Sequence, residues 1–307
     1  MPYVLQTHNL SKKYKRQYAV DQVNMNIEKG DIYGFVGENG SGKTTIIRLI
    51  TGLIQPHSGG FTLFGVSDKS SDITRVRRNV GAIVESPSIY RNMSAYENLA
   101  MQCRLVGVSA ESRVEQVLTE VGLQDVIHDK KRVANFSLGM RQRLGIAMAL
   151  LSEPEFLILD EPMNGLDPAG IVEVRELILR LNREKGITFL ISSHILTELQ
   201  LVATKYGIIS KGKLIQEITA QQLHQQCGKT TVIEVEDPSR LLSQMQTMWP
   251  ACEVTAQGEG VSIVGEIDLN ETLKAIVADT NPIRRVQCTE GGVEEYYLSL
   301  IGGGNRG

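Results

Sequence analysis

The sequence predicts an α/β domain over residues 1–218, followed by a small α+β domain over 219–307. In the first part, buried apolar runs such as IYGFVG and FLILD alternate with helical patterns, which is typical of a sheet covered by helices. After Ile218 a glutamine-rich stretch leads into segments such as TTVIEVE, where apolar and polar residues alternate as in half-buried strands. Each part has the size of an independent domain.

The spacing of apolar residues predicts the strands and helices of the first half. Alternating apolar residues predict short strands with turns over residues 3–30. IYGFVG is then a buried strand, and TTIIRLITGL is a helix that ends before Pro56. Further strand material is expected at 61–63 and 80–84.

A helical period begins near Ser94 and predicts a helical subdomain over about 86–152. The apolar face of one of its helices consists of Val114, Val117, Leu118 and Val121. FLILD follows as a central parallel strand, because it is apolar throughout and bounded on both sides. A helix around 171–181 and the buried strand ITFLIS continue the alternation.

Composition excludes several classes of protein. The net charge is −3 and no basic stripe is obvious, so we expect no nucleic-acid binding. From Gln221 onward there are 6 basic and 12 acidic residues, and the simplest interpretation is a solvated acidic surface. The four cysteines lie far apart without a CxxC pair, which indicates neither a zinc framework nor a disulfide scaffold and suits a reducing compartment. The last residues, GGGNRG, are expected to form a loose tail.

No segment indicates secretion or membrane insertion. The N-terminus lacks the apolar stretch of a signal peptide. The longest apolar run, around 144–151, is far shorter than the roughly 20 residues that a spanning helix needs. We therefore expect a soluble chain, so that any membrane role must come through another chain.

The segment GENGSGKTT matches the spacing G-x-x-x-x-G-K-[ST] of a phosphate-binding loop. Glycines let the backbone wrap closely, so that consecutive N–H groups point at phosphate oxygens, and the following helix dipole favours their charge. Lys43 is expected to reach the β and γ phosphates of a nucleoside triphosphate, and Thr44 to offer its hydroxyl to Mg²⁺. A glycine-rich turn could match by accident, but the strand before it and the helix after it favour the loop. The residues expected to bind the nucleotide here are Gly37, Glu38, Asn39, Gly40, Ser41, Gly42, Lys43, Thr44 and Thr45.

The segment FLILDEP places acidic groups at the end of a buried strand, where ligands of open α/β sheets bind. Asp160 is expected to hold Mg²⁺, directly or through water, and Glu161 is the candidate general base for the attacking water. Taken alone, the pattern could be a strand that ends in solvated acids. His194 closes another buried strand and can contact the γ-phosphate there, although a lone histidine is usually structural.

The segment FSLGMRQRLGIAMAL resembles the signature of the ABC ATPase family, whose common form is LSGGQ. Ser137 and Gly139 match this form, whereas Phe136, Leu138 and Met140 replace its Leu, Gly and Gln. Ser137 could simply be an N-cap, but a capped helix N-terminus also presents N–H donors to an anion. In the family this helix faces the γ-phosphate bound by the other subunit. The resemblance therefore implies a homodimer on ATP binding, in which Ser137 and Gly139 complete the nucleotide site of the other copy.

The resemblance covers about Tyr3 to Ser210 and implies the fold of a P-loop NTPase ABC cassette, with a mixed central sheet and helices, an antiparallel β subdomain and a helical subdomain. Tyr14 falls where the family places an aromatic ring that stacks on adenine, although it could be an exposed loop tyrosine. Asp167, in the run NGLDP, matches a nucleotide-contacting loop near the dimer interface and is also a good N-cap. The catalytic residues that the resemblance implies are Glu161, His194 and Lys43.

One departure from the family pattern concerns Glu85, which stands where the family usually has a glutamine that contacts Mg²⁺ and the membrane partner. A carboxylate also ligates Mg²⁺, so the implied metal ligands are Thr44, Glu85 and Asp160. Glu85 and the run SLGMRQR together resemble the bacitracin-export and lantibiotic-immunity branch, in which ATPase and permease are separate chains. The resemblance then implies an ATP-hydrolysing subunit that drives integral-membrane permease subunits, docked on the segment from Ser86 to Leu99.

This branch implies export of, or immunity to, an antimicrobial peptide, and a cytoplasmic chain held on the inner face of the cell membrane by the permease. The alternative is a soluble ABC ATPase with a regulatory or non-transport role on ribosomes or DNA. Members of those classes usually carry two cassettes or a long coiled coil, and neither pattern is seen in this sequence. A nucleotide sensor without turnover would not need Glu161 and His194. The second domain could brace the dimer, bind a regulator or cover a sheet edge, and we expect dimer contacts.

Overall fold

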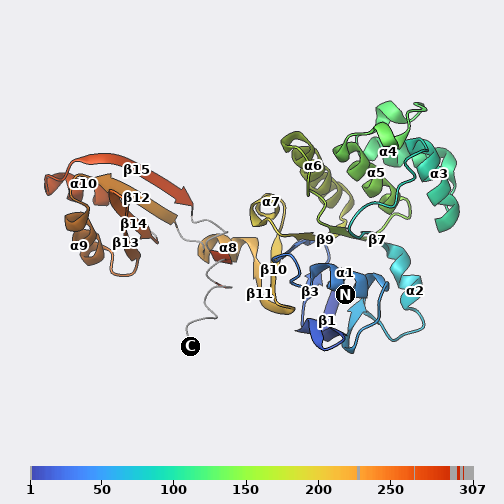
Figure 1. Ribbon diagram of the computed structural model, residues 1–307, viewed down its shortest axis with the longest axis horizontal. Coiled ribbons are helices and arrows are strands. Elements are labelled where there is room, and N and C mark those ends of the chain that lie inside the picture. The colour runs from blue at the N-terminus through green and yellow to red at the C-terminus, as the bar shows by residue number, and fades with distance from the viewer. Residues whose placement is uncertain (1, 227–228, 266, 291–295, 298–299, 301–307) are drawn as a thin grey trace. The chain divides into compact units, whose positions relative to one another are not determined.

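The computed structural model describes residues 2–226, 229–265, 267–290, 296–297 and 300. The chain divides into two compact units, Met1–Ala220 and Gln221–Gly307 (Figure 1). The tail GGGNRG, which the sequence predicts to be loose, lies outside the described residues.

The first unit is built on a six-stranded sheet with the strand order β11-β10-β4-β9-β8-β7. The strands from β10 to β7 run parallel, whereas β11 pairs antiparallel with β10. Every residue of β4, β8 and β9 is buried, as expected for central parallel strands covered by helices. In sheet order the strands are β11 (Lys213–Thr219), β10 (Lys205–Ser210), β4 (Ile32–Val36), β9 (Thr188–Ser193), β8 (Phe156–Asp160) and β7 (Val80–Ile83).

A second sheet of the same unit is antiparallel and has the order β2-β1-β5-β6, with β3 also paired to β1. Its buried side chains, such as Leu5 and Phe61, share one core with Ile46 of α1 (Lys43–Thr51) and with Phe156 of the central sheet. The helix α1 therefore packs between the two sheets. The strands are β1 (Tyr3–Tyr14), β2 (Gln17–Val23), β3 (Asn26–Glu28), β5 (Ser58–Leu63) and β6 (Val66–Ser67).

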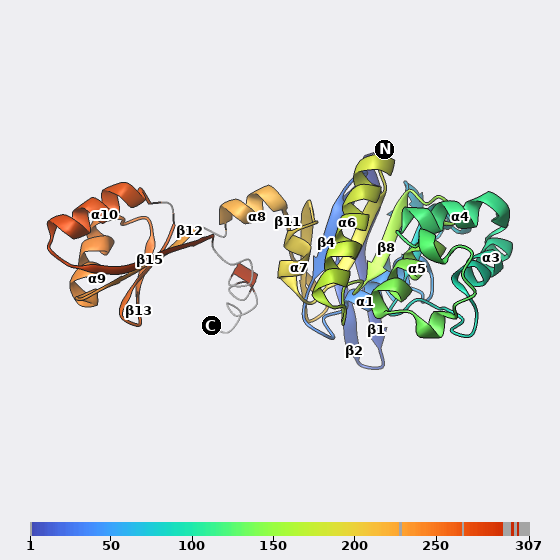
Figure 2. The same ribbon diagram turned by 90° about the horizontal axis from the view of Figure 1, so that it is seen from above.

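Three helices group together as a helical subdomain (Figure 2). Ser94 begins the first of them with a capping box to Glu97. The predicted apolar face over Val114, Val117 and Leu118 is confirmed, since these side chains are fully buried. The subdomain comprises α3 (Ala95–Val106), α4 (Ala110–Glu120), α5 (Leu138–Leu150) and two short 3₁₀ turns (Gln124–Val126 and Val133–Asn135). The other helices of the chain's first 226 residues are α2 (Ile73–Val76), a 3₁₀ turn (Arg77–Asn79), α6 (Pro168–Lys185), α7 (Leu196–Gln200) and α8 (Ala220–Gln226).

The second unit has its own four-stranded antiparallel sheet, in the order β13-β14-β12-β15. The chain order β12-α9-β13-β14-α10-β15 with this pairing is the split βαβ, or ferredoxin-like, arrangement. The side chains of Leu241 and Ile276 from the two helices join Ile233 and Ile263 from the sheet in a separate core. The elements are β12 (Lys229–Val235), α9 (Pro238–Met248), β13 (Glu253–Gln257), β14 (Gly260–Val264), α10 (Leu269–Ala278) and β15 (Ile283–Glu290). The predicted mixed sheet, antiparallel sheet, helical subdomain and small α+β addition are thus confirmed.

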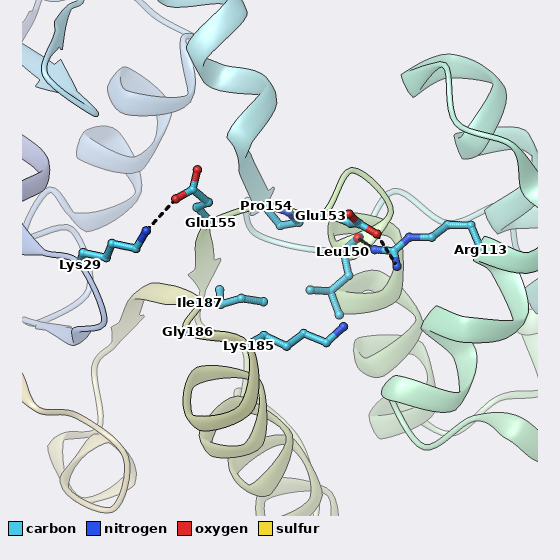
Figure 3. A pocket seen from close by; sticks show the side chains of 9 residues that line it. All are labelled: Lys29, Arg113, Leu150, Glu153, Pro154, Glu155, Lys185, Gly186 and Ile187. Carbon is cyan, nitrogen blue, oxygen red and sulfur yellow. Dashed lines mark hydrogen bonds and ion pairs between the residues drawn. The ribbon is translucent and has the colours of Figure 1, made fainter. Parts of the chain in front are cut away.

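A pocket of about 390 Å³ in the first unit lies at the amino ends of β8 and β9 (Figure 3). Arg113 reaches it from α4, and its side chain is only 9% exposed. Its Nε donates to the Leu151 carbonyl at 3.1 Å, its Nη2 donates to the Leu150 carbonyl, and its Nη1 lies 3.2 Å from Glu153 Oε1. Arg113 therefore caps the carboxyl end of α5. The pocket is lined by Lys29, Arg113, Leu150, Glu153, Pro154, Glu155, Lys185, Gly186 and Ile187.

Replacing Arg113 by alanine is expected to lower the free energy of unfolding of the first unit by about 2–4 kcal/mol, because the buried Leu151 carbonyl loses the arginine donor and the Leu150 carbonyl keeps only the Glu153 N–H. Urea denaturation followed by circular dichroism measures this change. Glu153→Gln is the matched control, because that carboxylate is 75% exposed and its loss should cost less than about 1 kcal/mol. Trp249, the single tryptophan, reports on the second unit, whose transition should not move. An Arg113→Ala variant as stable as the Glu153→Gln variant would contradict the capping role.

Candidate nucleotide site

The phosphate-binding loop connects the carboxyl end of β4 to the first residue of α1. At two positions of this loop a side chain would clash with a neighbouring backbone, so glycine is required. A Cβ on Gly37 would lie 2.4 Å from the Ile209 carbonyl oxygen, and one on Gly42, where φ is 112°, would lie 2.5 Å from the Ala19 carbonyl oxygen. Gly42 gives α1 no side-chain cap, and no acidic residue lies in its first turn. The first N–H groups of α1 are therefore available to an anion.

Lys43 lies inside this loop, with 5% of its side chain exposed. Its Nζ donates to the carbonyl of Gly37 at 2.6 Å and to that of Glu38 at 3.3 Å. The buried hydroxyl of Ser41 has no hydrogen-bond partner in the described part of the chain. Because a buried polar group normally has a partner, this orphaned hydroxyl suits a loop that takes up a polar ligand. Glu38, Asn39 and Gly40 are exposed at the mouth of the loop, and Thr44 and Thr45 are half-buried.

The structure brings Lys43, Glu161 and His194 together. Glu161 follows the last residue of β8 and has a left-handed backbone conformation, with φ of 50°. Its Oε1 lies 3.4 Å from Lys43 Nζ, and its Oε2 lies 2.7 Å from His194 Nδ1. Glu198 belongs to the same electrostatic group. Partial burial raises the pKa of its carboxyl, the His194 charge lowers that pKa, and the Glu161 charge raises it.

Asp160 is 2% exposed and is oriented by Ser192, which the sequence analysis did not single out. The Ser192 hydroxyl donates to Asp160 Oδ1 and accepts the Glu161 backbone N–H at 3.0 Å. The parallel register of β8 and β9 places Asp160 directly opposite Ser192, which explains the contact. In the sequence, Ser192 could have been singled out only because two serines precede His194 at the end of a buried strand.

The donors near the loop suit Mg²⁺. Thr44 offers a hydroxyl and Asp160 a carboxylate, and Mg²⁺ commonly binds one or two carboxylates together with water and substrate phosphates. Among the described residues, no three His, Cys, Asp or Glu side chains are grouped closely enough to hold a metal ion. Phosphate oxygens and water would therefore supply most of the ligands.

The remaining predicted site residues lie in other surroundings. Ser137 caps α5 by accepting the Met140 N–H at 3.1 Å, and Asp167 caps α6 by accepting the Gly170 N–H at 3.1 Å. A Cβ on Gly139 would lie 3.7 Å from the Gly170 Cα, so the amino ends of α5 and α6 adjoin. Among the described residues, no hydrogen bond or ion pair joins the side chains of Ser137 or Asp167 to those of Lys43 or Glu161.

Tyr14 and Glu85, two further predicted site residues, are exposed. Tyr14, the last residue of β1, is 45% exposed, and Lys12 Nζ lies 5.6 Å from its ring centroid. An exposed ring is free to stack on a base, but the contact needed for that assignment is with a ligand. Glu85 has φ of 64°, and its recorded partner is Arg48 of α1, with which it forms an ion pair.

Comparison with known proteins identifies the family. The sequence pattern described as ABC transporter matches residues 20–164. The chain is 40% identical over 309 residues to the bacitracin transport ATP-binding protein BcrA of Bacillus licheniformis, with 100% of both chains covered. The chain belongs to the ABC transporter family. It is the ATP-binding subunit of such a transporter, and the predicted nucleotide binding and ATP hydrolysis coupled to transport are confirmed at the level of the family.

Another relative and a solved structure similar to this ABC protein also belong to transporters. It is 45% identical over 214 residues to the lantibiotic transport ATP-binding protein SrtF of Streptococcus pyogenes, covering 70% of this chain and 90% of that one. Among solved structures, cbiO1 of Clostridium perfringens, part of the ABC transporter complex cbiONQ, matches with a TM-score of 0.67 and 25% identity. That match covers 82% of this chain and 97% of cbiO1. No helix that the structure describes in this ABC protein is long and apolar enough to cross a membrane.

Proposed function

We propose that this ABC protein energises a separate membrane permease that exports, or gives immunity to, an antimicrobial peptide. The observation that supports this most strongly is the 40% identity to a bacitracin transport ATP-binding protein over 100% of both chains. The similarity thus includes the second unit and is not limited to the part that many ABC proteins share. In this proposal residues 1–218 are the ATPase domain and 219–307 an accessory domain, with the chain at the cytoplasmic face of the membrane.

The contacts of Glu161 support its role as the general base. Its carboxylate is held between Lys43 Nζ and His194 Nδ1, at the carboxyl end of a buried strand. A triphosphate that enters the loop competes for the Lys43 ammonium and so releases Glu161 toward the attacking water. His194 then keeps one Glu161 oxygen oriented and lies beside the γ-phosphate. Mg²⁺, held by Thr44 and by Asp160 with its Ser192 hydrogen bond, would neutralise part of the phosphate charge.

A second copy of the chain would complete the site. Ser137, Gly139 and Asp167 lie at the adjoining amino ends of α5 and α6, and these ends present N–H groups suited to an anion. Since no hydrogen bond or ion pair between described residues joins them to Lys43 of the same chain, the proposal places them against the nucleotide of the partner copy. Tyr14 would stack on adenine. The net charge of −3 gives no reason to include a nucleic-acid partner.

A groove of about 420 Å³ in the first unit is the proposed permease-docking site. It includes part of the Ser86–Leu99 segment and has apolar walls from α3, α5 and β7. Val106, at the end of α3, is a lining residue with 42% of its surface exposed. The groove is lined by Leu53, Val80, Gly81, Ala82, Ile83, Val84, Ser86, Pro87, Ser88, Gln102, Val106, Gly145, Met148, Ala149 and Ser152.

Introducing a charge into this groove is expected to separate the two proteins. Val106→Asp should reduce co-purification with a co-expressed multi-span permease by about tenfold or more, because a carboxylate would be buried in the interface without a partner. Cells that express the Val106→Asp chain together with the permease should lose tolerance to bacitracin or to a lantibiotic to a similar degree. The isolated Val106→Asp chain should still bind ATP. Leu105→Asp is the matched control, because Leu105 is 73% exposed and does not line the groove. Equal effects of both variants would contradict the docking site, and the absence of any membrane partner or peptide tolerance in the parent would contradict the proposed function.

A further inference from the structure

Glu85 already has a cationic partner within its own chain. It follows β7 in a left-handed conformation, with φ of 64°, that a residue with a side chain adopts uncommonly. Its side chain is 61% exposed, and Oε1 pairs with Nη2 of Arg48, which is 39% exposed. The negative charge that distinguishes this chain from the usual glutamine pattern is therefore balanced by a residue of α1.

The position of Arg48 on α1 relates this ion pair to the nucleotide site. Arg48 comes four residues after Thr44, and residues i and i+4 of a helix lie on the same face. One helical turn advances about 5.4 Å along the axis. Arg48, the partner of Glu85, therefore lies on the same face of α1 as Thr44 and about one helical turn from it.

The residues that flank Glu85 connect the ion pair to the docking groove. Val84 and Ser86 both line the groove, as does Leu53 just beyond the end of α1. Val84 and Ser86 are bonded directly to Glu85, so a movement of the Glu85 backbone also moves these two lining residues of the groove. The ion pair lies between the nucleotide-binding helix and the surface assigned to the permease.

From this placement we infer that Arg48 is a positioning residue that competes with the divalent cation for Glu85. In the structure Arg48 of α1 holds the Glu85 carboxylate in an ion pair. A divalent cation held by Thr44 and Asp160 would attract the same carboxylate, which would then divide its interaction between two cations, and the segment that carries Glu85 would shift with it. The inference rests on the proposed function, because it uses the assignment of Thr44 and Asp160 to the metal.

The test measures Mn²⁺ binding to the full chain in the presence of ATP, in a Glu161→Gln background that limits hydrolysis, by electron paramagnetic resonance of the free ion. Arg48→Gln should tighten Mn²⁺ binding by about two- to fivefold, the range that an exposed ion pair can account for. Arg48→Lys, which keeps the charge, should stay closer to the parent. When Glu85 is also replaced by glutamine, Arg48→Gln should have no effect. Lys29→Gln is the matched control, since it removes the exposed pair with Glu155 at the opposite ends of the strands and should leave Mn²⁺ binding unchanged.

The dependence on Glu85 separates this inference from a general effect of charge. An equal gain from Arg48→Gln with glutamate or with glutamine at position 85 would overturn it, and so would no gain at all. If the parent binds ATP but no Mn²⁺ with it, the metal assignment fails and the inference fails with it. If the parent shows ATP-dependent Mn²⁺ binding and Arg48→Gln does not change it, only this inference is contradicted and the proposed function is unaffected.

Discussion

Glu161→Gln is expected to slow ATP hydrolysis by about 10²-fold or more while ATP still binds. The amide has almost the same shape as the carboxylate and can still accept a hydrogen bond from His194, but it cannot take a proton from water. The loss should therefore fall on turnover, because the groups that hold the phosphates remain in place. Steady-state phosphate release and equilibrium ATP binding, measured on the same preparation, separate the two effects.

The matched control for this variant is Glu155→Gln. Glu155 immediately precedes the other end of the same strand, is 51% exposed and pairs with Lys29, so its charge lies away from the phosphate loop. Its replacement should leave hydrolysis within about twofold of the parent. A Glu161→Gln variant with the turnover of the parent would refute the general-base assignment, whereas loss of ATP binding would mean that Glu161 chiefly supports the loop through Lys43.

Lys43→Ala is expected to weaken ATP binding by about 10- to 100-fold, and hydrolysis should fall at least as far. The side chain is almost fully buried, and its ammonium can exchange its contacts with Gly37 and Glu161 for phosphate oxygens. Hydrogen bonds to charged groups contribute about 1.5–3 kcal/mol each, which corresponds to this range of affinity. Isothermal titration of the variant with ATP measures the loss directly.

Two comparisons make the Lys43 result specific. Lys213→Ala removes a lysine that is 66% exposed and pairs with Asp21, and it should bind ATP as the parent does. Circular dichroism of Lys43→Ala should match that of the parent, since the loop is short and the core around α1 is apolar. Parental ATP affinity in a folded Lys43→Ala chain would exclude this lysine from the site.

The sequence by itself was enough to determine features that depend on neighbouring residues. The phosphate loop could be predicted because Gly37, Gly42 and Lys43 lie within one short segment, where steric limits and helix polarity act locally. The N-caps at Ser137 and Asp167 were foreseen for the same reason. The family resemblance added the order of the motifs, and the full-length relatives confirm the family and the ATPase activity.

Only the tertiary structure decided which distant residues meet. Ser192 reaches Asp160 because β8 and β9 are adjacent and in parallel register, and no local pattern states that register. The ion pair of Arg48 and Glu85 joins residues 37 positions apart, so no local pattern could have predicted it. The split βαβ arrangement of the second unit likewise depends on strand order. Local propensity determines an element, whereas the pairing of elements depends on how the whole core packs, and that is the physical reason for the difference.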